Sequence, residues 1–295
     1  AKFELNGWGF NTTPQAALNN RRGYQPRGKV LGGSSSINAM VYIRGQHADY
    51  DHWAAQGNPG WGWEDVKPYF VRAENNERGA NDWHGQGGPF NVADLRAPNR
   101  FSQYFTDAGV QAGHPHNTDF NGATQEGVGL YQVTHKNGER HSAAKGYLTP
   151  HLARPNLQVI TGARATRILF DGKRAVGVEY RQGGSLQQVK ASREVLLSAG
   201  ALLSPQLLML SGVGAGAQLQ KHGVAVLHDL PGVGAHLHDH PDVVQVMDAP
   251  ALKDLFGLSL SGMAQTVRGM LEWRKHRTGM LTTNFAEAGG FIKSD

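Results

Sequence analysis

A pair of glycines followed by three serines, at positions 32 to 36, is the feature that most restricts how this chain can fold. Serine is a favoured N-cap residue and an apolar run follows, so the pattern predicts a helix that begins within Ser34–Ser36. Bare glycine lets the backbone approach a phosphate, and the N–H groups of a helix start attract negative charge. The segment therefore suits an anion site, and it suits an ordinary capped helix after a tight turn equally well.

Glycine is also unusually frequent along the rest of the chain. It accounts for 39 of the 295 residues, whereas its usual share is about 7%. The glycines follow no period and 39% of the residues are hydrophobic, which argues against both collagen and disorder. The remaining explanation for the glycine content is a fold with many tight turns and close backbone approaches, as expected in a protein wrapped around a large cofactor.

The composition excludes several classes of protein. The most apolar segment, residues 195–210, is interrupted by serine, glycine and proline, so no transmembrane segment is expected. The absence of cysteine rules out disulfides, thiolate metal sites and a cysteine nucleophile. The 29 basic and 24 acidic residues are scattered, so nucleic acid is not an expected partner. A serine hydrolase is not expected either, because no G-x-S-x-G elbow is present.

The hydrophobic pattern predicts a mixed α/β protein whose two domains are each assembled from discontinuous pieces. Strand-like runs occupy residues 157–161, 164–170, 175–181, 186–190, 194–198 and 289–292. Helices are expected at 49–56, 64–74, 100–111 and 258–277, and from Ser204-Pro205 to Leu210, where Gly212 provides the stop. Residues 74–99, rich in asparagine, glycine and tryptophan, are expected to form an irregular loop.

Two further segments have the residues of a binding site. Ala199-Gly200 joins a predicted strand to a predicted helix, where α/β sheets hold nucleotides, although a plain turn explains it as well. The run 212–217 matches G-x-G-x-x-G/A but follows a helix, so we interpret it as a helix end and a loop. His236, His238 and His240 could bind zinc if the segment were extended, but the proline that follows suggests a turn and no metal is expected.

Four motifs occur in order along the chain, at Gly28–Gly45, Gly138–Leu148, Gly200–Gly214 and Gly232–Pro241. Together they resemble the glucose–methanol–choline family of FAD-dependent oxidoreductases, and especially its bacterial branch of choline and primary-alcohol dehydrogenases. The resemblance covers essentially the whole chain. It implies a Rossmann-like FAD-binding domain and a substrate domain on an antiparallel sheet, both discontinuous and incomplete here. Residues 1–73 and 137–235 would be pieces of the FAD-binding domain, and 74–136 and 236–295 pieces of the substrate domain.

The resemblance also assigns cofactor-binding residues. The FAD diphosphate and ribityl chain would lie along Gly32, Gly33, Ser34 and Ser35, and the flavin ring would pass Asn38, Ala39, Met40 and Val41. The adenine would meet the backbone of Ala165, and its adenosine end would be flanked by Ser198, Ala199 and Gly200. Some relatives attach flavin through a histidine just before the motif asparagine. That position is Ile37 here, so non-covalent FAD is expected.

By the same resemblance, the protein would oxidise a primary alcohol or a choline-like alcohol to an aldehyde by hydride transfer to flavin N5. Oxygen, a quinone or another acceptor would then reoxidise the flavin, in the cytoplasm or peripherally at a bacterial inner membrane. The catalytic histidine block is expected C-terminal to Asp295, so the isolated chain is expected to be inactive. His47, His84 and His135 are interpreted as surface or structural residues. A non-catalytic binding module on the same scaffold is the alternative, and a histidine-ligated zinc hydrolase is a weaker one.

Overall fold

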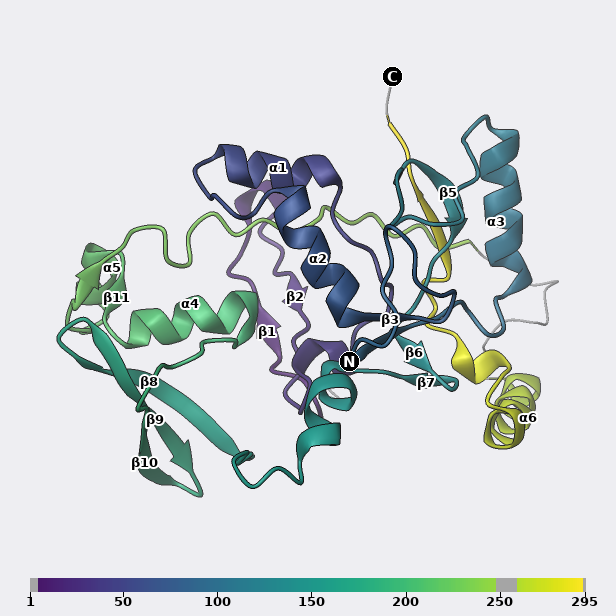
Figure 1. The fold of residues 1–295 in the computed structure, drawn as a ribbon. Helices are drawn as coiled ribbons and strands as arrows, with labels where there is room; N and C mark the ends of the chain where they lie inside the picture. Colours follow the sequence, from purple (N-terminus) through teal and green to yellow (C-terminus); the bar gives the residue numbers. More distant parts are fainter. Residues whose placement is uncertain (1–4, 248–258, 294–295) are drawn as a thin grey trace. The chain divides into compact units, whose positions relative to one another are not determined.

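The computed structural model describes residues 5–247 and 259–293 (Figure 1). Backbone contacts divide the chain into two compact units. Unit 1 comprises Ala1–Leu157 and Pro250–Asp295, and unit 2 comprises Gln158–Ala249. This is a mixed helix-and-sheet protein, as predicted, but its sheets are small. The assignment of discontinuous pieces to a cofactor domain and a substrate domain stays a prediction.

Unit 1 contains four α-helices among its described residues. These are α1 (His47–Ala55), α2 (Trp63–Ala73), α3 (Arg100–Gln111) and α6 (Leu260–His276). All four helices lie within two residues of the predicted bounds. The short helical turns are η1 (Ala16–Leu18), η2 (Gly33–Ser36), η3 (Ala144–Leu148), η4 (Thr149–His151) and η5 (Met280–Thr282).

The strands of unit 1 form two-stranded pairs. Antiparallel pairs are β1 (Phe10–Asn11) with β2 (Tyr24–Gln25), β5 (Gly127–Leu130) with β13 (Ala288–Phe291), and β6 (His135–Lys136) with β7 (Glu139–Arg140). The strands β3 (Glu74–Asn76) and β4 (Phe90–Val92) run parallel. The predicted strand at 289–292 is therefore confirmed as β13, and its partner lies about 160 residues earlier, as the register Gly289↔Gly129 shows.

Helix α3 is fixed at its first turn to the residue that immediately precedes the strand β13. The Asn99 side chain caps the helix by accepting a hydrogen bond from the Phe101 N–H (2.9 Å). The buried carboxylate of Glu287 accepts hydrogen bonds from the Asn99 N–H (2.6 Å) and the Ser102 hydroxyl (2.9 Å). Figure 1 shows the helix beside β5 and β13, so a residue at the end of the chain positions a helix from its first half.

Two expectations for unit 1 are wrong. The serine triplet does not start an α-helix, because η2 is a four-residue 3-10 turn that ends at Ser36, and Met40 then takes a left-handed backbone with φ 59°. All three serine hydroxyls bond to nearby main chain, which favours turns over a continuing helix. Residues 74–99 are not wholly irregular either, since they contain β3 and β4, whose polar residues Glu74, Asn76 and Asn91 are buried.

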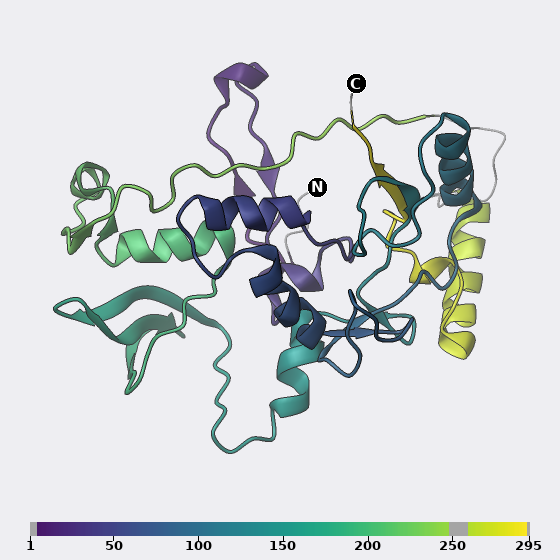
Figure 2. The same ribbon diagram turned by 45° about the horizontal axis from the view of Figure 1, so that its top comes forward.

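Unit 2 is a three-stranded antiparallel sheet with helices, seen from a second direction in Figure 2. The sheet has the order β10-β9-β8, formed by β8 (Ala163–Asp171), β9 (Arg174–Gln182) and β10 (Ser185–Lys190), which confirms the strands predicted at 164–170, 175–181 and 186–190. The other elements are α4 (Gly200–Leu210), α5 (Gly216–Lys221) and the parallel pair β11 (Val213–Gly214) and β12 (His228–Asp229). The Ser211 hydroxyl ties α4 to the sheet, since it accepts a hydrogen bond from the Ile168 N–H (2.8 Å).

Three expectations near or within unit 2 are wrong. Residues 157–161 and 194–198 are not strands, because in the described part of the chain neither finds a strand to pair with, and Leu196 is 80% exposed. Helix α4 starts at Gly200 and not at Ser204, whose hydroxyl accepts a hydrogen bond from the Ala199 N–H (3.0 Å). Gly212, with φ 87°, does end the helix as predicted.

Candidate functional site

The predicted cofactor-binding segment of unit 1, residues 28–42, is called the cofactor loop here. Gly32 (φ 87°) and Gly33 (φ 55°) both have left-handed backbones, which other residues adopt only at a cost. A Cβ at Gly32 would lie 2.6 Å from the Ser36 hydroxyl oxygen, whereas a Cβ at Gly33 would meet no atom within 4 Å. Gly32 is therefore needed for packing within the loop, while Gly33 borders open space.

The serine hydroxyls of the loop hold the loop itself. The Ser35 hydroxyl donates to the Gly32 carbonyl (2.6 Å) and that of Ser36 to the Leu31 carbonyl (2.8 Å). The Ser34 hydroxyl accepts from the Gly28 N–H (3.2 Å). These bonds stabilise the turn and leave the backbone as the surface that a ligand would approach.

The second motif, residues 138–148, braces the cofactor loop. The Arg140 guanidinium donates hydrogen bonds to the Ser35 carbonyl (3.1 Å) and to Asn38 Oδ1 (2.8 Å). The Ala143 N–H donates to the Ser35 hydroxyl (2.9 Å). Two motifs that lie about 100 residues apart in the sequence thus form one local structure, which no periodicity or spacing indicated.

The end of the loop is exposed on one side and held on the other. Ile37, Asn38 and Ala39 are exposed, whereas Met40 is buried. Hydrogen bonds from other segments of unit 1 hold the backbone of these residues and of Tyr42.

Three hydrogen bonds hold this backbone. The Ala39 carbonyl accepts one from Asn284 Nδ2 (2.7 Å), and the Met40 carbonyl accepts one from the Thr134 N–H (2.8 Å). The Tyr42 N–H donates the third to the Gln132 carbonyl (2.9 Å). Val41 forms an isolated antiparallel bridge with Val133. Gly32 to Ser35 and Asn38 to Val41 therefore lie on one continuous segment of unit 1 whose backbone is held by hydrogen bonds from other segments.

The remaining predicted residues belong to unit 2. Ala165 lies on β8, exposed, where the register with β9 shifts between Ala165 and Arg167. Ser198 and Ala199 are exposed immediately before α4, and Gly200 (φ 89°) is the first residue of that helix.

Sequence reasoning missed a buried ionic cluster beside the cofactor loop. Glu74, fully buried, accepts hydrogen bonds from Arg44 Nη2 (2.8 Å) and His84 Nδ1 (3.0 Å). His84 Nε2 donates to Asp119 (2.9 Å). Burial opposes the charged form of His84, but the bonds to Asp119 and Glu74 outweigh it and raise its pKa to about 9.

The carboxylates of this cluster shift in the opposite direction. Burial by itself would raise the pKa of Glu74, yet the hydrogen bonds from His84 and from the Gly85 N–H, with the charge of Arg44, lower it. His84 likewise lowers the pKa of Asp119 against the effect of burial. Arg44 belongs to the first motif, but its partners carry no motif, so only the three-dimensional structure reveals the cluster.

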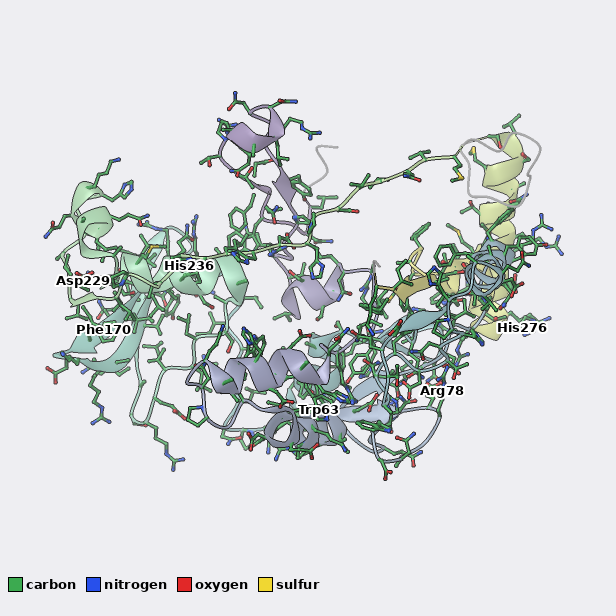
Figure 3. All side chains as sticks on the ribbon, turned by 90° about the horizontal axis from the view of Figure 1, so that it is seen from above. Trp63, Arg78, Phe170, Asp229, His236 and His276 are labelled. Carbon is green, nitrogen blue, oxygen red and sulfur yellow. The ribbon has the colours of Figure 1, made fainter. Side chains whose placement is uncertain are left out.

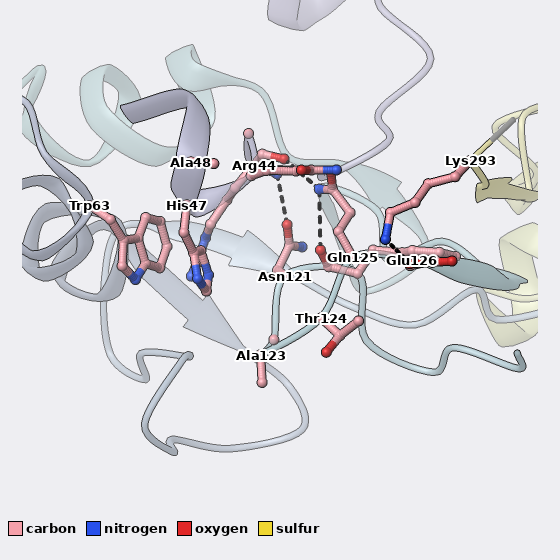
Figure 4. A pocket seen from close by; sticks show the side chains of 14 residues that line it. Arg44, His47, Ala48, Trp63, Asn121, Ala123, Thr124, Gln125, Glu126 and Lys293 are labelled. Carbon is pink, nitrogen blue, oxygen red and sulfur yellow. Dashed lines mark hydrogen bonds and ion pairs between the residues drawn. The ribbon is translucent and has the colours of Figure 1, made fainter. Parts of the chain in front are cut away.

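A cavity of about 260 Å³ lies next to the cluster in unit 1 (Figure 4). Around it, the Arg44 N–H donates to Asn121 Oδ1 (2.7 Å), Gln125 donates to the Arg44 carbonyl (2.9 Å), and Lys293 pairs with Glu126 (2.7 Å). His47 lines the cavity and is stacked on Trp63, with ring centroids 4.0 Å apart. None of the predicted cofactor-binding residues lines this cavity.

The other histidines considered from the sequence are in different surroundings. His135 is buried, and burial, followed by the charges of Arg140 and Arg96, lowers its pKa. His236, labelled in Figure 3, has φ 56°, and its neighbours His238 and His240 are exposed as it is. Over residues 5–247 and 259–293, no three potential ligands form a group that could hold a metal ion. Over the same residues, no helix is long and apolar enough to cross a membrane.

Comparison with known proteins identifies the family. The sequence model of the GMC oxidoreductases matches residues 10–242, which is most of the chain. The chain belongs to the GMC oxidoreductase family.

Relatives of this GMC oxidoreductase chain include an "Alcohol dehydrogenase [acceptor]" of Pseudomonas putida, 49% identical over 97% of the chain and 52% of the relative. An "Oxygen-dependent choline dehydrogenase" of Brucella anthropi is 44% identical over 99% of the chain and 53% of the relative. Among solved structures, an FAD-dependent oxidoreductase from Chaetomium thermophilum matches with a TM-score of 0.83 and 28% identity, over 96% of this chain and 52% of that one. The GMC chain thus spans about half the length of these relatives.

Proposed function

We propose that this chain is part of an FAD-dependent enzyme that oxidises an alcohol, and that the cofactor loop binds the flavin. One observation carries the proposal: Ile37, Asn38 and Ala39 are exposed, yet hydrogen bonds from other segments hold the backbone around them. A surface that is both accessible and rigid suits the binding of a planar ring system, because little ordering entropy is lost on binding.

The residues fit this cofactor. Open space beside Gly33 lets a phosphate or ribityl group approach the main chain, and the serine hydroxyls are already engaged. We assign the diphosphate and ribityl chain to the backbone of Gly32, Gly33, Ser34 and Ser35, and the flavin ring to Asn38, Ala39, Met40 and Val41. We assign the adenosine to Ala165, Ser198, Ala199 and Gly200. Ile37 offers no nucleophile, so the flavin is held non-covalently.

FAD, when bound, supplies the acceptor for the hydride that leaves the alcohol carbon. The chain's own residues provide a fixed support for it. Arg140 holds the Asn38 amide, and Asn284 and Thr134 hold the carbonyls of Ala39 and Met40, so the surface does not rearrange when the ring binds.

The substrate class follows the names of the relatives, an alcohol dehydrogenase and choline dehydrogenases. We propose a primary or choline-like alcohol as substrate, and oxygen, a quinone or another acceptor as the oxidant. A cytoplasmic or peripheral inner-membrane location in a bacterium is part of the same proposal.

Two matched glycine variants of the full-length protein test the proposal. Gly33 and Gly172 have the same φ of 55°, and a Cβ would meet no atom within 4 Å at either position. Valine therefore carries a similar backbone cost of about 1–2 kcal/mol at both, but only Gly33→Val fills the space assigned to the cofactor. We expect G33V to lose flavin absorbance and alcohol-dependent dye reduction, whereas G172V keeps both.

Retention of normal flavin content by G33V would show that the loop does not bind the cofactor. A full-length protein that holds flavin but reduces no dye with any primary alcohol or choline would contradict the proposed reaction and favour a non-catalytic binding module. The two measurements therefore separate an error in the site from an error in the activity.

A further inference from the structure

A second cavity of unit 1, of about 710 Å³, lies at the β6–β7 hairpin and the end of α6. The two elements are in contact, because Trp273 Nε1 of α6 donates a hydrogen bond to the Gly138 carbonyl in the hairpin turn (2.8 Å). The volume falls within the range of small-molecule sites, roughly 300–1,000 Å³. The cavity is lined by Arg96, Lys136, Asn137, Glu139, Arg140, His141, Lys145, Thr149, His276 and Arg277.

The lining is strongly basic, with five lysine and arginine side chains and a single carboxylate. That carboxylate, Glu139, is already engaged twice, by Lys145 Nζ (2.8 Å) and by Arg277 Nη1 (2.6 Å). The other three cations, Arg96, Lys136 and Arg140, have no carboxylate partner among the described residues. The cavity therefore has an excess of positive charge that the described residues do not neutralise.

Two of these cations are directed by bonds to neutral oxygens. Arg140 donates to the Ser35 carbonyl and to Asn38 Oδ1, and Arg96 makes a long bond to the Arg277 carbonyl (3.4 Å). Burial lowers the pKa of Arg140, so its charge has lost solvent without gaining a counter-ion. Neighbouring His135 has a buried Nδ1 without a hydrogen-bond partner, and the positive charges of Arg140 and Arg96 disfavour its protonation.

The dipole of α6 does not account for this charge. Cations are favourable near a helix C-terminus, which explains His276 and Arg277, but the effect falls off within the last turn. Arg96, Lys136, Arg140 and Lys145 come from other segments of the chain. Their convergence costs electrostatic free energy in the absence of an anion.

We propose that this cavity binds a small oxyanion with two or more negative charges, a phosphate or a polycarboxylate. The guanidinium groups of Arg96 and Arg140 can each donate paired N–H bonds, which match the oxygens of phosphate and carboxylate groups. Lys136 adds a point charge at the exposed side of the cavity.

Direct binding measurements on the full-length protein test the site. Calorimetric titration with inorganic phosphate and, separately, with citrate distinguishes the two sources of the oxyanion. The test variant is Arg96→Glu with Lys136→Glu, which leaves Arg140 and the cofactor loop intact. The control is Lys173→Glu with Lys190→Glu, which makes the same change in net charge at two exposed positions of unit 2.

We expect saturable binding of at least one anion, weakened tenfold or more in R96E/K136E and by less than twofold in K173E/K190E. Binding of phosphate alone, or of citrate alone, supports the site and identifies its ligand class. Absence of saturable binding at low ionic strength would overturn the proposal, and so would equal affinities in the two variants. Because the comparison is between variants, the result does not depend on whether flavin is bound.

Discussion

The buried ionic cluster makes a sharp prediction about stability. Glu74→Gln keeps the shape of the side chain and removes its charge. The replaced carboxylate accepts hydrogen bonds from Arg44, His84, Asn76 and the Gly85 N–H, all between 2.8 and 3.1 Å. The side chains of Arg44 and Glu74 are only 2% and 0% exposed, so water cannot replace the lost charge.

The expected cost is large for a single isosteric change. Removal of one partner from a buried ion pair typically costs about 3–5 kcal/mol, because the other charge is left uncompensated. For a compact unit of about 200 residues, each kcal/mol lowers the melting temperature by roughly 2–4 °C. We therefore expect Glu74→Gln to lower the melting temperature of unit 1 by roughly 6–20 °C.

Thermal unfolding monitored by circular dichroism measures this shift. The matched control is Glu126→Gln, which removes the same charge from a surface pair with Lys293, whose side chain is 81% exposed. We expect no measurable shift for the control, because exposed ion pairs contribute little. Equal melting temperatures for Glu74→Gln and the wild type would refute the argument that burial makes this cluster stabilising.

Four further outcomes are expected. The pKa of His84 is raised to about 9, so the contribution of this histidine to stability is complete below pH 6.5, its ordinary pKa, and is lost as the pH rises through 9. Urea unfolding at several pH values should show this loss of stability, and the His84→Gln variant should not show it. Glu287→Gln should destabilise α3 by about 1–3 kcal/mol, measurable as faster amide exchange in that helix, and unchanged exchange would contradict the anchoring role. Ser211→Ala leaves the Ile168 N–H unpaired and should cost unit 2 about 1–3 kcal/mol in urea unfolding, whereas a neutral effect would show that the bond is dispensable. Acid precipitation should leave the flavin in the supernatant, and flavin that stays with the pellet would disprove non-covalent binding.

Sequence reasoning predicted the elements whose signals are local. Helix α3 was predicted to the residue, and the strands predicted at 164–170, 175–181 and 186–190 are β8, β9 and β10. It failed where distant partners decide the outcome. Residues 157–161 and 194–198 have strand character but no partner strand in the described chain. The serine triplet failed for a local reason instead, because its hydroxyls bond to the main chain of the same loop and close a 3-10 turn.

In the candidate site too, some residues could be predicted from local sequence and others could not. The glycines and serines of the cofactor loop could be selected from motif spacing, and the structure holds them in one segment. The residues that support them, Arg140, Thr134 and Asn284, could not be selected, because their roles depend on contacts over about 100 residues or more. The ionic cluster of Glu74 and His84 gave no signal for a different reason: its contacts span only 10 to 35 residues, but Glu74, His84 and Asp119 belong to no motif.

The bond from Asn284 to the Ala39 carbonyl, which joins residues 245 positions apart, has a consequence for biosynthesis. At about 5–20 residues per second, a ribosome adds Asn284 roughly 12–50 s after Ala39. During that interval the nascent loop lacks one of its supports. If the cofactor loop binds flavin as proposed, stable flavin incorporation is a late event, and a ribosome stalled before residue 284 should carry a chain that releases its cofactor readily.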